Sequence, residues 1–424
     1  MIFKSKLFSA TWDTWMYYHN GTYYLYYLIT QTGYGEGFGV ASSADGVHFT
    51  DHGAAILASE NMQIYLGTGA IWKASDFETS GTFICNYSEW RKHLDGVRQN
   101  ILFATSKDLI HWEKCGDIFM FSPDGDLYKE YRSVWARWDT INTIDRPEGG
   151  YYGFFTAVPK DRRIGFGLGE SIDGLSWAAL PPPEVALGPF SEVKKTEVAT
   201  VCEHAGRIYL LIGGVVHRYG VGVYTADNVF GPYVPAEINF GIFSNAHFEH
   251  AYYTRFFHAG DSLLCNHHAI LRQQNDYGRP ITYLAPIKRV AFDEAGILRL
   301  MWWEGNQAAK GAEKQAATGD CILEGIMGTG RQLTLMLEDG SETVIVVEKT
   351  GEVTYMLREN DTLQTDESYE RGFAIASAPF IRLLTREGLT ELYADDHFIG
   401  CYTPAAPVKE ITHDLTDVRV WEWA

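Results

Sequence analysis

The sequence predicts an all-β protein, a five-bladed β-propeller followed by a C-terminal β-sandwich, and three observations predict it. A glycine at a turn, followed by an apolar, aromatic-rich strand, recurs five times at intervals of 54 to 69 residues. A polar turn with Asp and then an aromatic residue follows most copies. No segment longer than about ten residues shows helical periodicity before residue 300.

The first pattern occurs once in each predicted blade. It reads GTYYLYYLIT from Gly21, GTFICNYSE from Gly81, GYYGFFTAV from Gly150, GRIYLLIGG from Gly206 and GDSLLCNHHAI from Gly260. Each interval has room for about four strands, which is one propeller blade, and radial packing protects the inner strand edges. A β-sandwich also contains many short strands, but it would not repeat one order of motifs five times. The propeller is therefore the favoured prediction.

The repeated pattern stops near residue 300, and a different domain is expected beyond it. The stretch NQAAKGAEKQAATGD at 306–320 is small and polar, as in a connector. Alternating strands such as RQLTLMLED and VRVWEWA follow it. We therefore expect the propeller over residues 1–305 and the sandwich over residues 306–424.

The composition restricts the classes of partner. A formal net charge of −19, without a basic run, argues against nucleic acids and anionic membranes. The 12 Trp and 25 Tyr residues suit β-rich packing, and a few of them suit stacking on a sugar ring. A neutral small oligosaccharide is the expected substrate class, while the oligomeric state stays open.

Targeting signals and cofactor motifs are not found. The N-terminal MIFKSKLFSATWDTW lacks the apolar stretch of a signal peptide, and no run approaches the ~20 apolar residues of a membrane span. The six cysteines show no CxxC pairing, so we expect a cytoplasmic protein with reduced thiols. His267-His268 lacks a third ligand at a useful spacing, and no nucleotide-binding glycine motif occurs, so no metal and no cofactor are predicted.

Three acids precede the repeated glycines at matching places. Asp13, Asp139 and Glu197 lie eight, eleven and nine residues upstream of the glycines of blades one, three and four. This segment should form the innermost strand, which faces the central channel. All three acids have apolar or aromatic neighbours, where a carboxylate is costly without a partner or a task. Paired carboxylates around a sugar-sized cavity are typical of glycoside hydrolysis, so these three are the predicted catalytic residues.

Further residues near these acids are candidates for substrate binding. The tryptophans could stack on a sugar, although packing between blades is an equal alternative. Gln63 precedes the second-blade motif YLGTGAIW and could bind a hydroxyl group. His250 occupies the axis-facing position of blade five, beside Glu249. The predicted binding residues are Trp12, Trp15, Gln63, Trp72, Arg137, Trp138 and His250.

The order of these motifs resembles glycoside hydrolase family 32, the invertases and fructanases, within a five-bladed clan that includes arabinanases. NGTYYLYYL resembles the family's first strand, GFGVASSADGVHF its turn before an outer strand, and YLGTGAIW its second-blade motif. Arg137-Trp138-Asp139 resembles the family's Arg-Asp motif, and Glu197 through Gly206 its acid/base motif. ELYADDHFIGCYT resembles a strand of the family's C-terminal sandwich.

This resemblance implies a role for each acid. Asp13 would be the nucleophile, Asp139 the stabiliser that binds sugar hydroxyls, and Glu197 the general acid/base. The implied function is an exo-acting, retaining glycosidase for β-fructofuranosides or a related furanoside. Retention predicts that the carboxyl groups of Asp13 and Glu197 lie ~5–5.5 Å apart, and inversion predicts ~6.5–9.5 Å.

The chain also departs from the family's motifs. Trp-Asp-Thr replaces Asn-Asp-Pro at Asp13, Arg-Trp-Asp-Thr replaces Arg-Asp-Pro at Asp139, and Glu-Val-Ala replaces Glu-Cys-Pro at Glu197. These changes predict a divergent branch with a reshaped pocket. Two alternatives stay open: an inverting propeller hydrolase that resembles arabinofuranosidases or xylosidases, and a non-catalytic carbohydrate-binding propeller.

Overall fold

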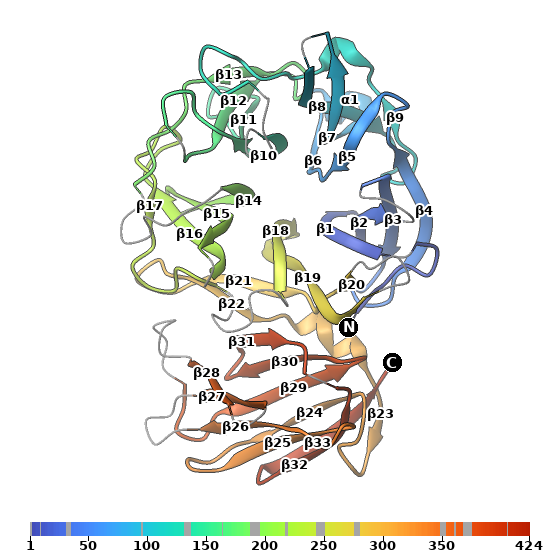
Figure 1. Cartoon of the computed structure of the whole chain (residues 1–424), viewed down its shortest axis with the longest axis vertical. Helices are drawn as coiled ribbons and strands as arrows, with labels where there is room; N and C mark the ends of the chain where they lie inside the picture. Colours follow the sequence, from blue (N-terminus) through green and yellow to red (C-terminus); the bar gives the residue numbers. More distant parts are fainter. Residues whose placement is uncertain are drawn as a thin grey trace.

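The computed structural model has a ring of sheets with a two-sheet sandwich beneath it (Figure 1). The structure describes residues 2–8, 10–30, 35–94, 96–130, 137–162, 164–186, 196–216, 219–242, 251–274, 280–347, 353–359, 362–367, 375–404 and 406–424. Across these ranges, no helix is both long and apolar enough to cross a membrane.

Blades one and two begin the ring. Blade one has the strand order β1 (Ala10–His19), β2 (Thr22–Thr30), β3 (Gly37–Ser43) and β4 (Thr50–Leu57). Blade two has an interrupted inner strand, and both of its pieces pair with the second strand. Its elements are β5 (Met62–Gly67), β6 (Ile71–Lys73), α1 (Phe77–Ser80), β7 (Phe83–His93), β8 (Gly96–Ser106), β9 (Glu113–Lys114) and the 3-10 turn η1 (Asp117–Phe119).

The remaining blades complete the ring of five that the repeats predict. Blade three contains β10 (Trp138–Asp145), β11 (Tyr151–Ala157), β12 (Gly167–Ser171) and β13 (Ala178–Leu180). Blade four contains β14 (Glu197–His204), β15 (Arg207–Val216), β16 (Tyr219–Ala226) and β17 (Val234–Pro235). Blade five contains β18 (Ala251–Ala259), β19 (Ser262–Gln274), β20 (Pro280–Leu284), β21 (Lys288–Phe292) and β22 (Leu298–Trp302).

The C-terminal strands form the sandwich. One face has the order β31 (His397–Tyr402), β30 (Leu389–Ala394), β29 (Phe380–Arg386), β24 (Cys321–Ile326), β33 (Thr416–Trp423) and β23 (Lys310–Lys314). The other has β28 (Thr362–Glu367), β27 (Val353–Glu359), β26 (Glu342–Val347), β25 (Gln332–Leu337) and β32 (Val408–His413). The turn η3 (Glu304–Ala309) precedes β23, and β31 pairs with β22 at Met301 and His397, so the first face continues the sheet of blade five.

The two repeated motifs have clear structural roles. All five repeat glycines have positive φ angles, between 60° and 82°, which a glycine adopts without steric cost. Four of them turn the inner strand into the second strand, and Gly81 instead ends α1 before β7. In the Asp motif, the carboxylates of Asp45, Asp108 and Asp173 accept backbone N–H groups two and three residues further on. Such turns join the third and fourth strands of their blades.

Polar side chains join neighbouring blades near the axis. Asn86 of blade two donates to the carbonyl oxygen of Ile141 at 3.0 Å and accepts its N–H at 2.9 Å. Asn266 of blade five donates to the carbonyl oxygen of Thr14 in blade one at 2.9 Å. The ring also closes through the backbone, because Ile2 N donates to Leu284 O at 2.9 Å. Blade one is therefore held by the last blade, far away in the sequence.

Candidate active site

The innermost strands share an irregularity that shapes the channel. The pairing register shifts between Trp12 and Trp15 in β1, between Asp139 and Asn142 in β10, and between Val198 and Thr200 in β14. β5 and β18 have corresponding shifts. A bulge turns a side chain away from the regular alternation, and bulges are frequent beside active sites. Each of the three predicted acids lies at or immediately before such a shift.

Asp13 lies in the bulge of β1 with a φ angle of 45°. Its backbone N–H donates to Nδ1 of His268 at 3.1 Å, and its side chain is 18% exposed. Burial raises the pKa of Asp13 well above its ordinary value, and the charges of Glu197 and Asp139 raise it further. The cations Arg255 and Arg137 oppose this rise. The charges that act on Asp13 are therefore those of the other two predicted acids and of two arginines from other blades.

Arg137 connects the other two acids directly. Its Nη1 donates to Glu197 Oε1 at 2.6 Å, and its Nη2 contacts Asp139 Oδ2. Burial disfavours the charged guanidinium, but Asp139, Tyr65 and Glu197 outweigh it and raise the pKa of Arg137 well above its usual range. The ring of Tyr65 lies 5.9 Å from the guanidinium carbon. A planar guanidinium that binds two carboxylates fixes their relative positions.

Asp139 is held at its second oxygen as well. Its Oδ1 accepts a hydrogen bond from Ser88 Oγ at 2.5 Å and another from Thr140 Oγ1 at 3.0 Å. Gln99 Nε2 donates to the same Ser88 hydroxyl at 2.9 Å, and Gln99 Oε1 accepts the N–H of Trp138 at 3.2 Å. Asp139 is only 3% exposed, so its contacts with Arg137, Ser88 and Thr140 leave it little freedom to move.

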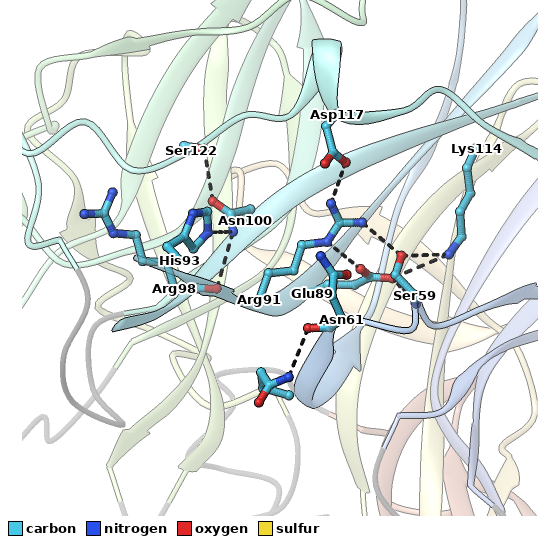
Figure 2. A network of polar contacts seen from close by, with 11 residues as sticks. Ser59, Asn61, Glu89, Arg91, His93, Arg98, Asn100, Lys114, Asp117 and Ser122 are labelled. Carbon is cyan, nitrogen blue, oxygen red and sulfur yellow. Dashed lines mark hydrogen bonds and ion pairs between the residues drawn. The ribbon is translucent and has the colours of Figure 1, made fainter. Parts of the chain in front are cut away.

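A separate polar network immobilises β7, the strand that carries Ser88. The next residue, Glu89, is fully buried and points to the opposite side, where its oxygens contact Ser59 at 2.9 Å and Arg91 at 2.8 Å. Figure 2 shows Arg91 between Glu89 and Asp117, and Lys114 also reaches toward Glu89. Both carboxylate oxygens of Glu89 have partners. Removal of one partner would leave part of this buried charge without compensation, which is costly.

Gly67 lies close to Ser88 and Asp139, and its replacement is the first testable prediction. A Cβ atom at this position would lie 2.4 Å from Ser88 Oγ and 2.7 Å from Asp139 Oδ1. Gly67→Ala should therefore displace Asp139 and lower kcat/KM by on the order of 10²-fold, as small misplacements of reacting groups do. In the control Gly328→Ala, the new Cβ meets no atom closer than 3.4 Å, and activity should stay unchanged. Wild-type kinetics in Gly67→Ala would contradict the assignment.

Arg255 of β18 in blade five contacts side chains of two other blades. Its Nη1 donates to Asn142 Oδ1 at 3.0 Å and its Nη2 to Thr68 Oγ1 at 3.2 Å, and the side chain is 2% exposed. Arg255 also lines a cavity of about 610 Å³, together with residues from the C-terminal parts of the inner strands. The charge of Arg255 also acts on Asp13, whose pKa it lowers against the larger effect of burial.

The structure corrects three of the predicted binding residues. Trp15, Trp72 and Trp138 are only 2%, 4% and 1% exposed. Trp15 stacks on Tyr26, while the indole N–H groups of Trp72 and Trp138 donate to carbonyl oxygens of Gly174 and Phe121. Packing between strands and blades buries these rings, so they are not exposed for stacking on a sugar as predicted.

The other predicted binding residues have different outcomes. Trp12 is partly exposed beside Asp13, with its ring 4.9 Å from that of His268. Gln63 is exposed on β5 and donates to Asn61 O at 3.2 Å. Arg137 contacts both acids, as described above. His250 and Glu249 lie outside the described residues. Among the described residues, no three His, Cys, Asp or Glu side chains are grouped closely enough to hold a metal ion.

Sequence reasoning missed several residues of the site. Ser88 and Gln99 belong to apolar strands, and the alternation of polar residues in NYSEW was their available signal, because Asn86 and Ser88 share a face. His268 was considered only as a metal ligand. Tyr65 and Arg255 carry no sequence signal of their own, since their roles depend on how five blades meet.

Comparison with known proteins shows one matching family model and several solved structures with the same fold. Residues 14–133 match the family model described as "Glycosyl hydrolases family 32 N-terminal domain". The β-fructofuranosidase of Bombyx mori has a TM-score of 0.75 at 12% identity, with 99% of this chain and 92% of that chain covered. The sucrose-6-phosphate hydrolase from Lactobacillus gasseri has a TM-score of 0.74 at 15% identity, with 98% and 91% covered.

A third solved structure agrees with the first two. The fructofuranosidase from Schwanniomyces occidentalis, complexed with fructose, has a TM-score of 0.64 at 12% identity, with 99% of this chain and 97% of that chain covered. No curated protein matches the chain. The chain therefore resembles the glycosyl hydrolases of family 32 in sequence over residues 14–133, and it shares the fold of the solved family 32 enzymes over almost its whole length.

Proposed function

We propose that this protein is a retaining, exo-acting glycoside hydrolase that cleaves β-fructofuranosides or a related furanoside oligosaccharide. The observation that carries the proposal is the convergence of Asp13, Asp139 and Glu197 on one channel, with Arg137 bound to two of them. The solved structures with this fold include enzymes that act on such sugars, named as β-fructofuranosidase and sucrose-6-phosphate hydrolase.

In the proposed first step, Asp13 attacks the anomeric carbon while Glu197 gives its proton to the leaving oxygen. A bond forms between the Asp13 carboxylate and the sugar, and the glycosidic bond breaks. Glu197 needs a proton for this step, whereas its 2.6 Å contact with Arg137 stabilises the carboxylate. We therefore expect bound substrate to weaken the contact between Arg137 and Glu197, while Arg137 keeps its contact with Asp139.

In the proposed second step, Glu197 takes a proton from water, and the resulting hydroxide attacks the anomeric carbon. The bond to Asp13 breaks, the sugar leaves with its original configuration, and both carboxyl groups regain their starting states. Asp139 forms no covalent bond. Its Oδ2 lies beside Arg137 and its Oδ1 is occupied by Ser88 and Thr140, so it is fixed in place to accept sugar hydroxyl groups.

The test is to incubate the purified protein with sucrose, short fructo-oligosaccharides, difructose anhydrides and arabino-oligosaccharides. NMR of the first product determines its anomeric configuration before mutarotation. We expect release of fructose or another furanose with retained configuration, and Glu197→Gln should lower the rate by about 10²- to 10⁴-fold. The variant should keep its fold, because the amide replaces the carboxylate without a change of size.

Other outcomes would overturn parts of this proposal. Release of arabinose with inverted configuration would keep the acids but require a water molecule between Asp13 and Glu197. Sugar binding by calorimetry without turnover, unchanged in Asp13→Asn, would indicate a carbohydrate-binding propeller instead.

A further inference from the structure

The nucleophile candidate Asp13 depends on a residue from the opposite end of the ring. Because Asp13 lies in the bulge of β1, between the paired residues Trp12 and Trp15, its N–H is directed away from the regular β1–β2 ladder. His268, 255 residues further along the chain, accepts that N–H through Nδ1 at 3.1 Å. An amide can only donate, so Nδ1 must carry a lone pair and the imidazole proton must be on Nε2.

The surroundings keep His268 in this state. His268 is fully buried, and the ring of Trp12 lies 4.9 Å from its own. Burial and the neighbouring His267 lower its pKa to about 3. The imidazole is therefore neutral throughout the ordinary working range, and its lone pair stays available to Asp13.

The strand that carries His268 is fixed on both sides. Asn266 donates to the backbone and hydroxyl oxygens of Thr14, next to Asp13, at 2.9 and 3.0 Å. His267 points the other way, into the sandwich, where its Nε2 lies 3.4 Å from Glu391 Oε1. Glu391 also binds Lys288 at 2.6 Å, and all three of these side chains are fully buried. Three consecutive residues of β19 thus join the sandwich to the strand of Asp13.

We propose that His268 is a positioning residue for the nucleophile: its unprotonated Nδ1 holds the backbone N–H of Asp13 and thereby keeps the bulge in the conformation that aims the carboxylate into the channel. The left-handed conformation of Asp13 costs free energy unless its surroundings determine it, and the hydrogen bond from a rigid strand does so. This inference rests on the role proposed for Asp13.

The experiment compares two replacements of His268 in the full chain. His268→Phe keeps a ring against Trp12 but leaves the Asp13 N–H without an acceptor, and we expect kcat to fall ~10- to 100-fold with KM changed less than about threefold. His268→Asn supplies an amide oxygen near the place of Nδ1, and we expect its kcat within about fivefold of wild type. His258→Phe, an exposed histidine of blade five, is the control and should behave as wild type.

Equal losses in both variants, with a matching rise in KM, would indicate a purely structural role and overturn the proposal. An unaffected His268→Phe would do the same. ¹⁵N NMR of histidine-labelled wild type supplies a test that needs neither activity nor a folded variant. We expect an unprotonated Nδ1 and a protonated Nε2 on His268 from about pH 5 to about pH 9, which is roughly two pH units on either side of neutrality.

The two hypotheses fail in different ways. A wild-type protein that hydrolyses no furanoside contradicts the proposed function. In that case the ¹⁵N chemical shifts of His268 still test whether its Nδ1 accepts the hydrogen bond from Asp13. A protonated Nδ1 contradicts the positioning role even in an active enzyme.

Discussion

Asp13→Asn is expected to lower kcat by roughly 10⁴-fold or more, because an amide cannot form the glycosyl ester and no other described carboxylate shares its position. KM should change little, since the amide keeps the size of the side chain. Stopped assays with the substrate identified for the wild type measure this effect. Asp145→Asn, at the other end of the channel on β10, is the matched control and should retain full activity. Substantial residual turnover would require a different nucleophile.

The same replacement should stabilise the fold at neutral pH. The pKa of Asp13 is raised in the folded protein by burial and then by Glu197, so the folded state binds this proton more tightly than the unfolded chain does. The folded state therefore loses free energy of unfolding as the pH rises. The loss begins near the pKa of Asp13 in the unfolded chain and ends above its raised pKa in the folded protein. Asp13→Asn removes that loss, so its Tm should exceed that of wild type at pH 7 and approach it in acid. Calorimetry at both pH values checks the sign.

Arg137→Met is expected to lower kcat/KM by roughly 10²- to 10³-fold, the cost of removing one preorganised charged donor from an active site. The substitution leaves Asp139 and Glu197 without their shared cation. Lysine should restore little of the activity, because one ammonium group cannot reproduce the two directed contacts of the guanidinium.

The pH profile of Arg137→Met has a predicted direction. Arg137 and Arg255 lower the pKa of Asp13, whereas Glu197 and Asp139 raise it, and His268 stays neutral beside it. Loss of Arg137 should raise the pKa of Asp13 further. Because the nucleophile must be ionised, the acid limb of kcat/KM should move to higher pH. A shift to lower pH would contradict the described electrostatics.

A matched control for this variant lies outside the channel. Arg146 also contacts two carboxylates, Glu170 at 3.0 Å and Glu148 at 3.9 Å, and its side chain is 18% exposed against 24% for Arg137. Arg146→Met should therefore reproduce any general cost of losing a half-buried arginine without changing the pH profile.

The site was only partly predictable from the sequence. The acids could be found because each precedes a repeat glycine in an otherwise apolar strand. The tryptophans beside them could not be assigned, because a single shift of register exchanges the two faces of a strand. Trp12 lies beside the site, whereas Trp15, beyond the bulge in the same strand, packs in the core. The position of a bulge is set by tertiary contacts and leaves no local pattern.

The sequence by itself determined the repeated architecture, because glycines with positive φ and Asp-containing turns act within a few residues and recur in each blade. It also determined which acids belong to inner strands. Only the tertiary structure decided how those acids are held. Arg137 meets Glu197 across 60 residues because blades three and four are neighbours in the ring. His268 meets Asp13 across 255 residues because the ring brings the first and last blades together. Contacts of that range depend on closure of the whole propeller, which no short segment encodes.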